Sequence, residues 1–272
     1  PEASLADLGS RATPAQRALA FEEIFLLQLA LAVRRLGIRE ESRGIAYEVT
    51  DALRTRLASL LPFRLTEAQR RVLREIGADL RAPHPMHRLL QGDVGSGKTI
   101  VAVLTLLVAV ENGYQAALMA PTEILADQHY RGLSRLLDLK GAGYRRAFLS
   151  GSVAGAARRR TLEGLASGEI EIVVGTHALF EEGVRFRRLG LVVVDEQHRF
   201  GVLQRAALAG KGARPDVLVM TATPIPRSLA LTLYGDLDLS VIDEMPPGRT
   251  PVRTVVRGEA DRGRVYEGVR RE

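Results

Sequence analysis

The stretch that decides the fold is GDVGSGKT, from Gly92 to Thr99, which has the spacing G-x-x-x-x-G-K-T. It follows the apolar pair Leu89 and Leu90, which predicts a short buried strand, and it leads into the apolar segment Ile100–Val110, which is long enough for a core helix. A glycine-rich loop between a strand and a helix is the setting that a phosphate-binding loop requires. The alternative, an ordinary glycine-rich turn, is weakened by the sequence that follows.

The residue types in this stretch suit a bound nucleotide. Backbone N–H groups of a glycine-rich turn can converge on phosphate oxygens where no side chain blocks the approach, and the following helix points its positive end at them. Lys98 would then reach the β and γ phosphates of ATP, and the Thr99 hydroxyl would ligate Mg²⁺. The predicted nucleotide-binding residues of the loop are Gly92, Gly95, Ser96, Gly97, Lys98 and Thr99.

After the loop, short apolar runs alternate with helical segments, and a polar cluster follows each apolar run. This alternation predicts an α/β fold with a parallel sheet, helices on both faces and a site along the carboxyl edge of the strands. The expected strands are Ala116–Ala120, Ala147–Leu149, Ile170–Val174, Leu191–Val194 and Val217–Met220, and the expected helices are Glu123–Leu137 and Ala154–Ala166.

Two acids, Asp195 and Glu196, follow the apolar run Leu191–Val194. Because Mg²⁺ takes oxygen ligands and usually retains waters, Asp195 can hold it through water while Glu196 orients and deprotonates the attacking water. Two solvated acids after a strand are the alternative. The presence of Lys98 and Thr99 favours the catalytic interpretation.

The residues before the loop predict three helices. The first spans residues 14–36, is opened by Thr13-Pro14 and is followed by Gly37 and Gly44, so we expect a bracing helix outside the main sheet. The second spans Val49–Leu60, and the third begins after Thr66, which we expect to cap it. Residues 78–85 are expected to form a loop.

Phe63 and Gln69, at the start of the third helix, suggest adenine recognition. The ring would stack on the base and the amide would pair with N6 and N7. A core phenylalanine with a solvated glutamine is the more common alternative.

The composition favours a globular protein with a polyanionic partner. The net charge is +6, and nearly all of the basic residues are arginines, a balance that weakly favours nucleic acid. No apolar run approaches the roughly 18 residues of a membrane span, and the first ten residues form no basic, apolar leader, which favours the cytoplasm. The chain contains no cysteine, so disulfides and thiolate metal sites are excluded.

The motifs together resemble the superfamily-two nucleic-acid helicases and, more narrowly, the bacterial RecG branched-DNA helicases. Gln197 favours this group over the related transcription-repair coupling translocases, which typically carry DEEH rather than DEQH. The resemblance rests on LTEAQ at Leu65–Gln69, GDVGSGKT at Gly92–Thr99, APTEILADQHY at Ala120–Tyr130, GTHAL at Gly175–Leu179, DEQHRFGVLQR at Asp195–Arg205, MTATPIPRSLALT at Met220–Thr232 and GDLDLSVIDEMPPGR at Gly235–Arg249.

The resemblance implies a RecA-like P-loop domain that uses ATP and Mg²⁺ and acts on branched or single-stranded DNA at stalled replication forks and Holliday junctions. It implies that Gln69 reads adenine and that Lys98, Asp195 and Glu196 are catalytic. It assigns the track of a DNA strand to Pro121, Thr122, Glu123, Gly175, Thr176 and His177, and the coupling of nucleotide state to domain movement to Gln197, His198, Thr221 and Thr223.

The resemblance also divides the chain. Residues 1–62 would form the helical bracing segment, residues 63–249 the first motor domain, and residues 250–272 the opening strand and helix of a second motor domain. The family also has a wedge domain that grips the fork, and its second motor domain supplies arginines to the ATP site. Because this sequence contains neither domain, we expect the chain alone to bind ATP but to hydrolyse it very slowly. A motor of the transcription-repair coupling type and a non-hydrolysing ATP-dependent DNA-binding module are the alternatives, and the presence of Glu196 disfavours the second.

Overall fold

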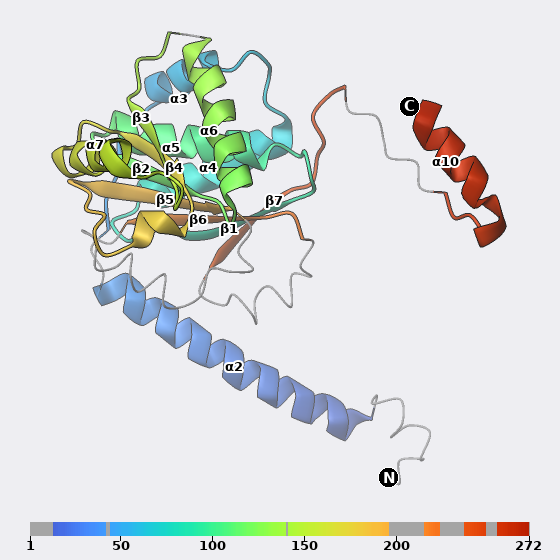
Figure 1. Ribbon diagram of the computed structural model, residues 1–272. Coiled ribbons are helices and arrows are strands. Elements are labelled where there is room, and N and C mark those ends of the chain that lie inside the picture. The colour runs from blue at the N-terminus through green and yellow to red at the C-terminus, as the bar shows by residue number, and fades with distance from the viewer. Residues whose placement is uncertain are drawn as a thin grey trace.

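The computed structural model describes residues 13–41, 44–139, 141–195, 215–223, 237–248 and 255–271. Within these ranges, β1 (His87–Gly92), β2 (Gln115–Met119), β3 (Arg146–Leu149), β4 (Ile172–Gly175), β5 (Leu189–Asp195), β6 (Asp216–Thr221) and β7 (Asp238–Ile242) form one sheet. The order is β3-β4-β2-β5-β6-β1-β7, and every pairing between neighbours is parallel. The expected parallel α/β sheet is therefore confirmed (Figure 1).

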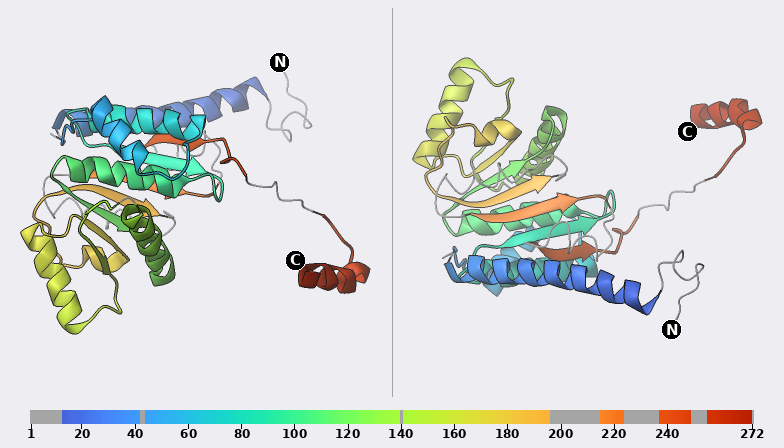
Figure 2. Two further views of the ribbon diagram at one scale, coloured as in Figure 1. Left: turned by 90° about the horizontal axis from the view of Figure 1, so that it is seen from above. Right: turned by 90° about the horizontal axis from the view of Figure 1, so that it is seen from below.

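Helices cover both faces of the sheet. Successive residues of each strand point to opposite faces, so a single strand contributes side chains to both of the cores that these helices cover. Ala116 and Leu118 of β2 belong to a core shared with α5 (Lys98–Glu111), α4 (Glu67–Leu80), α3 (Asp51–Ser59) and α6 (Glu123–Asp138). Ala117 and Met119 of the same strand pack into a second core that includes α7 (Gly155–Ser167) and the short 3₁₀ helix η1 (His177–Phe180). In Figure 2 the sheet runs from the β3 edge beside α7 to the β7 edge beside α4.

Threonine side chains cap three of these helices, and the sequence predicted the cap at Thr66. The Thr66 hydroxyl accepts from the backbone N–H of Gln69, and the Gln69 side chain accepts from the backbone N–H of Thr66, which together form a capping box. Thr50 and Thr122 cap α3 and α6 in the same way, through their side-chain oxygens. These caps satisfy N–H groups that the first helical turn leaves without intrahelical partners.

The N-terminal helix α2 (Pro14–Glu41) is longer than expected. Thr13 does precede it, and its hydroxyl accepts from the backbone N–H of Gln16. Gly37 lies inside α2 rather than beyond its end, so the predicted end of this helix at residue 36 is wrong. One glycine costs a helix only about 1 kcal/mol relative to alanine, which the surrounding helix formers offset. Apolar side chains of α2 remain exposed in the structure, for example Phe21 at 69% and Ile24 at 55%.

One further boundary differs from the prediction. The third helix, α4, continues to Leu80, so residues 78–80 are helical rather than part of a loop. The C-terminal segment contains η3 (Glu259–Asp261) and α10 (Arg262–Arg271), and its opening strand stays a prediction because residues 249–254 lie outside the described residues. None of the described helices is both long and apolar enough to cross a bilayer.

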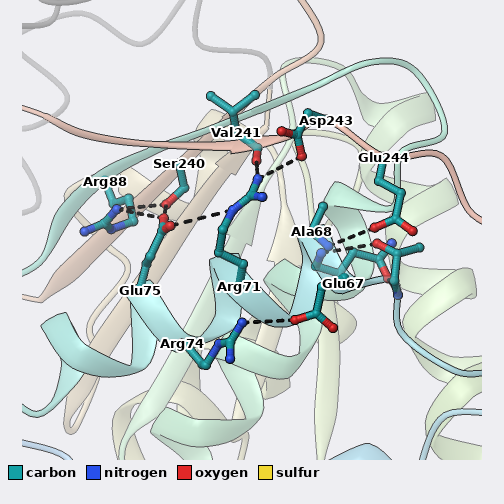
Figure 3. A network of polar contacts seen from close by, with 12 residues as sticks. Glu67, Ala68, Arg71, Arg74, Glu75, Arg88, Ser240, Val241, Asp243 and Glu244 are labelled. Carbon is teal, nitrogen blue, oxygen red and sulfur yellow. Dashed lines mark hydrogen bonds and ion pairs between the residues drawn. The ribbon is translucent and has the colours of Figure 1, made fainter.

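A polar network fastens α4 to β7 and to the chain that leaves it (Figure 3). The Arg71 guanidinium donates to the Val241 backbone oxygen and the Asp243 carboxylate, each at 2.8 Å. The Glu244 carboxylate accepts from the backbone N–H of Ala68 at 2.9 Å, and so it supports the first turn of α4. The helix that carries Gln69 is therefore held to the edge of the sheet by residues more than a hundred positions later in the sequence.

Candidate active site

The phosphate loop joins β1 to α5 at the carboxyl edge of the sheet. Gly95 and Gly97 adopt positive φ angles of 79° and 91°, a conformation that glycine takes without the steric cost of a Cβ atom. The Lys98 ammonium donates to the backbone oxygens of Gly92 at 2.8 Å and Asp93 at 2.9 Å, so its charge lies inside the curve of the loop. The loop therefore places a cation and the positive end of α5 together.

Two observations concern the fit of this loop to an anionic ligand. The Ser96 side chain is 1% exposed, and its hydroxyl has no hydrogen-bond partner within the described ranges. A Cβ atom on Gly92 would lie 2.5 Å from that hydroxyl, so the glycine keeps the space beside it open. A buried hydroxyl with no partner, next to backbone N–H groups and a lysine, fits an anionic ligand.

Gln69 connects α4 directly to the loop. Its side chain is 2% exposed, its Nε2 donates to the Ser96 backbone oxygen at 2.8 Å, and its Oε1 accepts from the Thr66 backbone N–H at 3.0 Å. The alternative of a solvated glutamine is therefore wrong, as is that of a core phenylalanine, because Phe63 is 52% exposed. Contact of these two residues with adenine stays a prediction.

Asp195 is the last residue of β5 and faces the same edge of the sheet. The register pairs Asp195 with Met220 of β6 and Met220 with Leu90 of β1. With about 4.8 Å between neighbouring strands, Asp195 lies about 10 Å across the sheet from the strand that begins the phosphate loop. The predicted partners Glu196, Gln197 and His198 lie outside the described residues.

His129 is a site residue that sequence reasoning missed. Its Nε2 lies 2.6 Å from Oδ2 of Asp195, and the two side chains are 11% and 15% exposed. The sequence did contain a signal for its position. His129 follows the α6 cap Thr122 by seven residues, or about two helical turns, so it lies on the same side of the helix as the start of the predicted DNA track. The spacing alone does not predict that α6 lies beside the end of β5.

The residues that could hold a metal are few. Thr99 is exposed at the start of α5, and Asp195 is largely buried at the end of β5. The described part of the chain contains no cluster of three or more histidine or acidic side chains arranged to hold a metal. Mg²⁺ in nucleotide sites is commonly held by one or two protein groups, phosphate oxygens and waters, so a hydroxyl and a carboxylate fit this ion when nucleotide is present.

The predicted DNA track consists of two segments that lie side by side. The Ala120 backbone N–H donates to the Gly175 backbone oxygen at 2.9 Å, which joins the end of β2 to the end of β4. Pro121 and Thr122 precede α6, with Thr122 exposed, and His177 is exposed at the start of η1.

Three residues of this track also have structural roles. The Glu123 carboxylate accepts from the hydroxyls of Ser150, at 3.0 Å, and Ser152. A Cβ atom on Gly175 would overlap the Leu149 backbone oxygen, and Thr176 is 4% exposed. Glycine at 175 is therefore required by the close approach of β3 to β4, whatever its role toward DNA.

The two predicted coupling threonines at the end of β6 contact each other. The Thr221 hydroxyl accepts from the Thr223 backbone N–H at 3.1 Å, and Thr221 is 3% exposed. Thr221 pairs with Gln91 of β1, one residue before the phosphate loop. The end of β6 therefore lies between the loop strand and the strand that carries Asp195.

Residues 66–232 match the DEAD/DEAH box helicase family, and this range contains the phosphate loop and all of the strands from β1 to β6. The chain belongs to this family. Within it, the chain is 53% identical to the ATP-dependent DNA helicase RecG of Synechocystis sp., over 95% of this chain and 31% of that protein. Identity to RecG of Bacillus subtilis is also 53%, over 88% of this chain and 35% of that protein.

A solved structure gives the same result for the fold. The structure of RecG bound to a three-way DNA junction superposes with a TM-score of 0.80 and 46% identity, over 93% of this chain and 34% of that one. The resemblance to RecG and the RecA-like fold are therefore confirmed. The chain spans about a third of the length of these relatives.

Proposed function

We propose that this chain is the first motor domain of a RecG-type, ATP-dependent DNA helicase that acts on branched DNA. The observation that carries the proposal is the phosphate loop, with Lys98 held inside it, on the same sheet edge as Asp195. That geometry supports nucleotide binding next to a carboxylate, and about 50% identity to RecG helicases supports the DNA substrate. The organisms of these relatives are bacterial, so we place the protein in the bacterial cytoplasm, where the chromosome lies.

In this proposal the loop residues bind and orient the nucleotide. The backbone N–H groups of Gly95, Ser96 and Gly97 contact the β phosphate, and the Lys98 ammonium moves from the backbone oxygens of Gly92 and Asp93 to the β and γ phosphates. Phe63 stacks on adenine, and Gln69 contacts the base from its position behind the loop. The exposure of Phe63 supports the stack, and the hydrogen bond from Gln69 to Ser96 places the amide beside the loop. To contact the base, the amide would exchange one of its hydrogen bonds to Ser96 and Thr66.

The acids at the end of β5 serve hydrolysis. Thr99 and Asp195 would hold Mg²⁺, which supplies neutralisation of the charge that develops on the phosphates. Glu196 orients the attacking water and takes its proton. Glu196 directly follows Asp195 in the sequence, and Asp195 ends β5 at the same sheet edge as the loop.

DNA binding and coupling complete the proposal. The track formed by Pro121, Thr122 and Glu123 with Gly175, Thr176 and His177 would contact backbone phosphates without reading bases. Gln197, His198, Thr221 and Thr223 would transmit the nucleotide state. The whole protein would add a second motor domain, whose arginines complete the ATP site, and a wedge domain that grips the fork.

The test is phosphate release from ATP by this chain, with and without branched DNA, beside Glu196→Gln and a matched control, Glu182→Gln at an exposed position. An arginine supplied from outside the domain is worth about 10³ to 10⁵ in rate, so we expect release close to background from this chain alone. In a full-length RecG polypeptide that carries this motor domain, DNA should stimulate release. There, Glu196→Gln should abolish release with ATP binding retained, and Glu182→Gln should change neither. Unchanged release in Glu196→Gln would overturn the role of Glu196, and a parent that DNA does not stimulate would overturn the helicase assignment.

A further inference from the structure

Helix α6 links two parts of the site that the proposed function keeps separate. Its cap Thr122 and its first residue Glu123 belong to the proposed DNA track, and His129 lies about two turns further along the helix. Seven residues of α-helix rise about 10 Å and return to nearly the same face. The DNA track and His129 therefore lie on one side of one rigid element.

The contact between His129 and Asp195 is short and sheltered. Nε2 and Oδ2 are 2.6 Å apart, and at least 85% of each side chain is removed from solvent. The tautomer that carries its proton on Nε2 donates this hydrogen bond to the carboxylate oxygen. Hydrogen bonds to an ionised acceptor in a site with little water are stronger than those at the surface, so this one fixes the direction of the Asp195 carboxylate.

Helix α6 is anchored as one element, by its apolar face and by its first turn. Ala126, Leu133 and Leu137 are buried against the sheet. At its first turn, the Glu123 carboxylate binds the Ser150 and Ser152 hydroxyls in the loop after β3. A strand of DNA that contacts Thr122 or Glu123 would therefore act on the same helix that holds Asp195.

We propose that His129 is a positioning residue that couples DNA binding at the start of α6 to the orientation of the Asp195 carboxylate. The proposal rests on the proposed function, since it needs a DNA track and a nucleotide site. DNA at Thr122 and Glu123 shifts α6, and His129 carries that shift to Asp195. Because such coupling is reciprocal, nucleotide bound beside Asp195 changes the affinity for DNA by the same factor by which DNA changes the affinity for nucleotide.

The test compares two side chains of similar size in a full-length RecG polypeptide that carries this motor domain. His129→Leu removes the donor, His129→Gln keeps an N–H group that can reach Asp195, and Arg131→Ala is the control. Arg131 is exposed on the same helix and pairs with Asp127. The readout is the dissociation constant for a branched DNA, measured with and without a non-hydrolysable ATP analogue, and thermal unfolding checks the fold of each variant.

Coupling in proteins is typically about 5-fold to 150-fold. We expect the ratio of the two dissociation constants to fall close to 1 in His129→Leu, to recover in part in His129→Gln, and to stay at the parental value in Arg131→Ala. DNA stimulation of phosphate release should fall in parallel, with ATP affinity within about threefold. If His129→Leu does not fold, His129→Asn takes its place, because the shorter asparagine side chain does not bring its N–H group within reach of Asp195. The two dissociation constants are then compared in the same way.

Two outcomes overturn the proposal, and they are distinguishable. Parental coupling in a folded His129→Leu or His129→Asn would overturn the role of His129 and leave the helicase assignment intact. A parent protein whose DNA affinity does not respond to nucleotide would overturn the assignment itself, and the role of His129 with it.

Discussion

Nε2 of Gln69 donates a hydrogen bond of 2.8 Å to the backbone oxygen of Ser96, across 27 residues of sequence. This contact makes the first turn of α4 part of the phosphate loop. A Cβ atom on Gly97 would overlap the same Nε2, so the two residues fit only while position 97 has no side chain. The shape of the loop therefore depends on a helix that lies before it in the chain.

Gly97→Ala should weaken ATP binding at least tenfold, because the new methyl group displaces Gln69 and the loop. Gly113→Ala is the matched control, since Gly113 also has a positive φ, of 77°, but nothing lies within 4 Å of its Cβ position. Both variants should lose about 1 kcal/mol of stability through the left-handed backbone. A fluorescent ATP analogue measures affinity, and parental affinity in Gly97→Ala would contradict the contact with Gln69.

Phe63→Ala tests the proposed stack on adenine. Base–aromatic stacking is worth about 1–3 kcal/mol by alanine substitution, so ATP affinity should fall about tenfold or more. Affinity for inorganic tripolyphosphate, which has no base, should not change. Phe21→Ala removes an exposed ring from α2 and should leave both affinities at the parental value. An equal loss for both ligands in Phe63→Ala would mean that the ring supports the loop and does not contact the base.

Asp216 should make stability fall as the pH rises. The residue is fully buried, its Oδ1 accepts from the Met86 backbone N–H, and its Oδ2 has no partner within the described ranges. Burial raises the pKa of the Asp216 carboxyl from 3.8 to about 7. Because the folded state holds the proton more tightly, the stabilisation is complete below about pH 4 and is lost as the pH approaches 7, with a total of about 4 kcal/mol.

Asp216→Asn should remove this dependence. Urea unfolding of parent and variant between pH 5 and pH 8 should show the variant gaining stability relative to the parent as the pH rises. Asp243→Asn is a control of opposite sign, because the Arg71 guanidinium lowers the pKa of the exposed Asp243 carboxyl. The parent should be more stable than Asp243→Asn by a constant amount between pH 5 and pH 8, and this difference should shrink only on acidification below about pH 4. Parallel pH profiles for the parent and Asp216→Asn would contradict the burial argument.

Glu244→Ala should destabilise the start of α4. The Glu244 carboxylate accepts from the Ala68 backbone N–H and places a negative charge at the positive end of the helix. Losing a cap of this kind costs about 1 kcal/mol. Glu244→Gln, which keeps the acceptor oxygen, should lose less, and Glu182→Ala removes the same charge from an exposed position without such an effect. Chemical denaturation is the measurement, and equal losses in Glu244→Ala and Glu182→Ala would refute the cap.

The sequence was informative wherever the pattern is local. The glycine spacing of Gly92–Thr99, the cap at Thr66 and the apolar run before Asp195 each depend on neighbours within a few residues, and the structure places all three as predicted. Strand β7 was not predicted from the sequence. Its burial pattern is irregular, and it is a short edge strand that pairs only with β1 in the described sheet. Its pairing partner, rather than its own composition, makes it a strand.

By itself, therefore, the sequence determined the element types, the phosphate loop and the set of polar residues at the strand ends, because hydrophobic periodicity and backbone conformation are short-range properties. Only the tertiary structure decided which of these residues meet. Gln69 reaches Ser96, His129 reaches Asp195 across 66 residues, and Glu244 reaches Ala68 across 176 residues. These contacts arise from strand order and helix packing, and a parallel sheet brings together residues whose separation along the chain gives no sign of it.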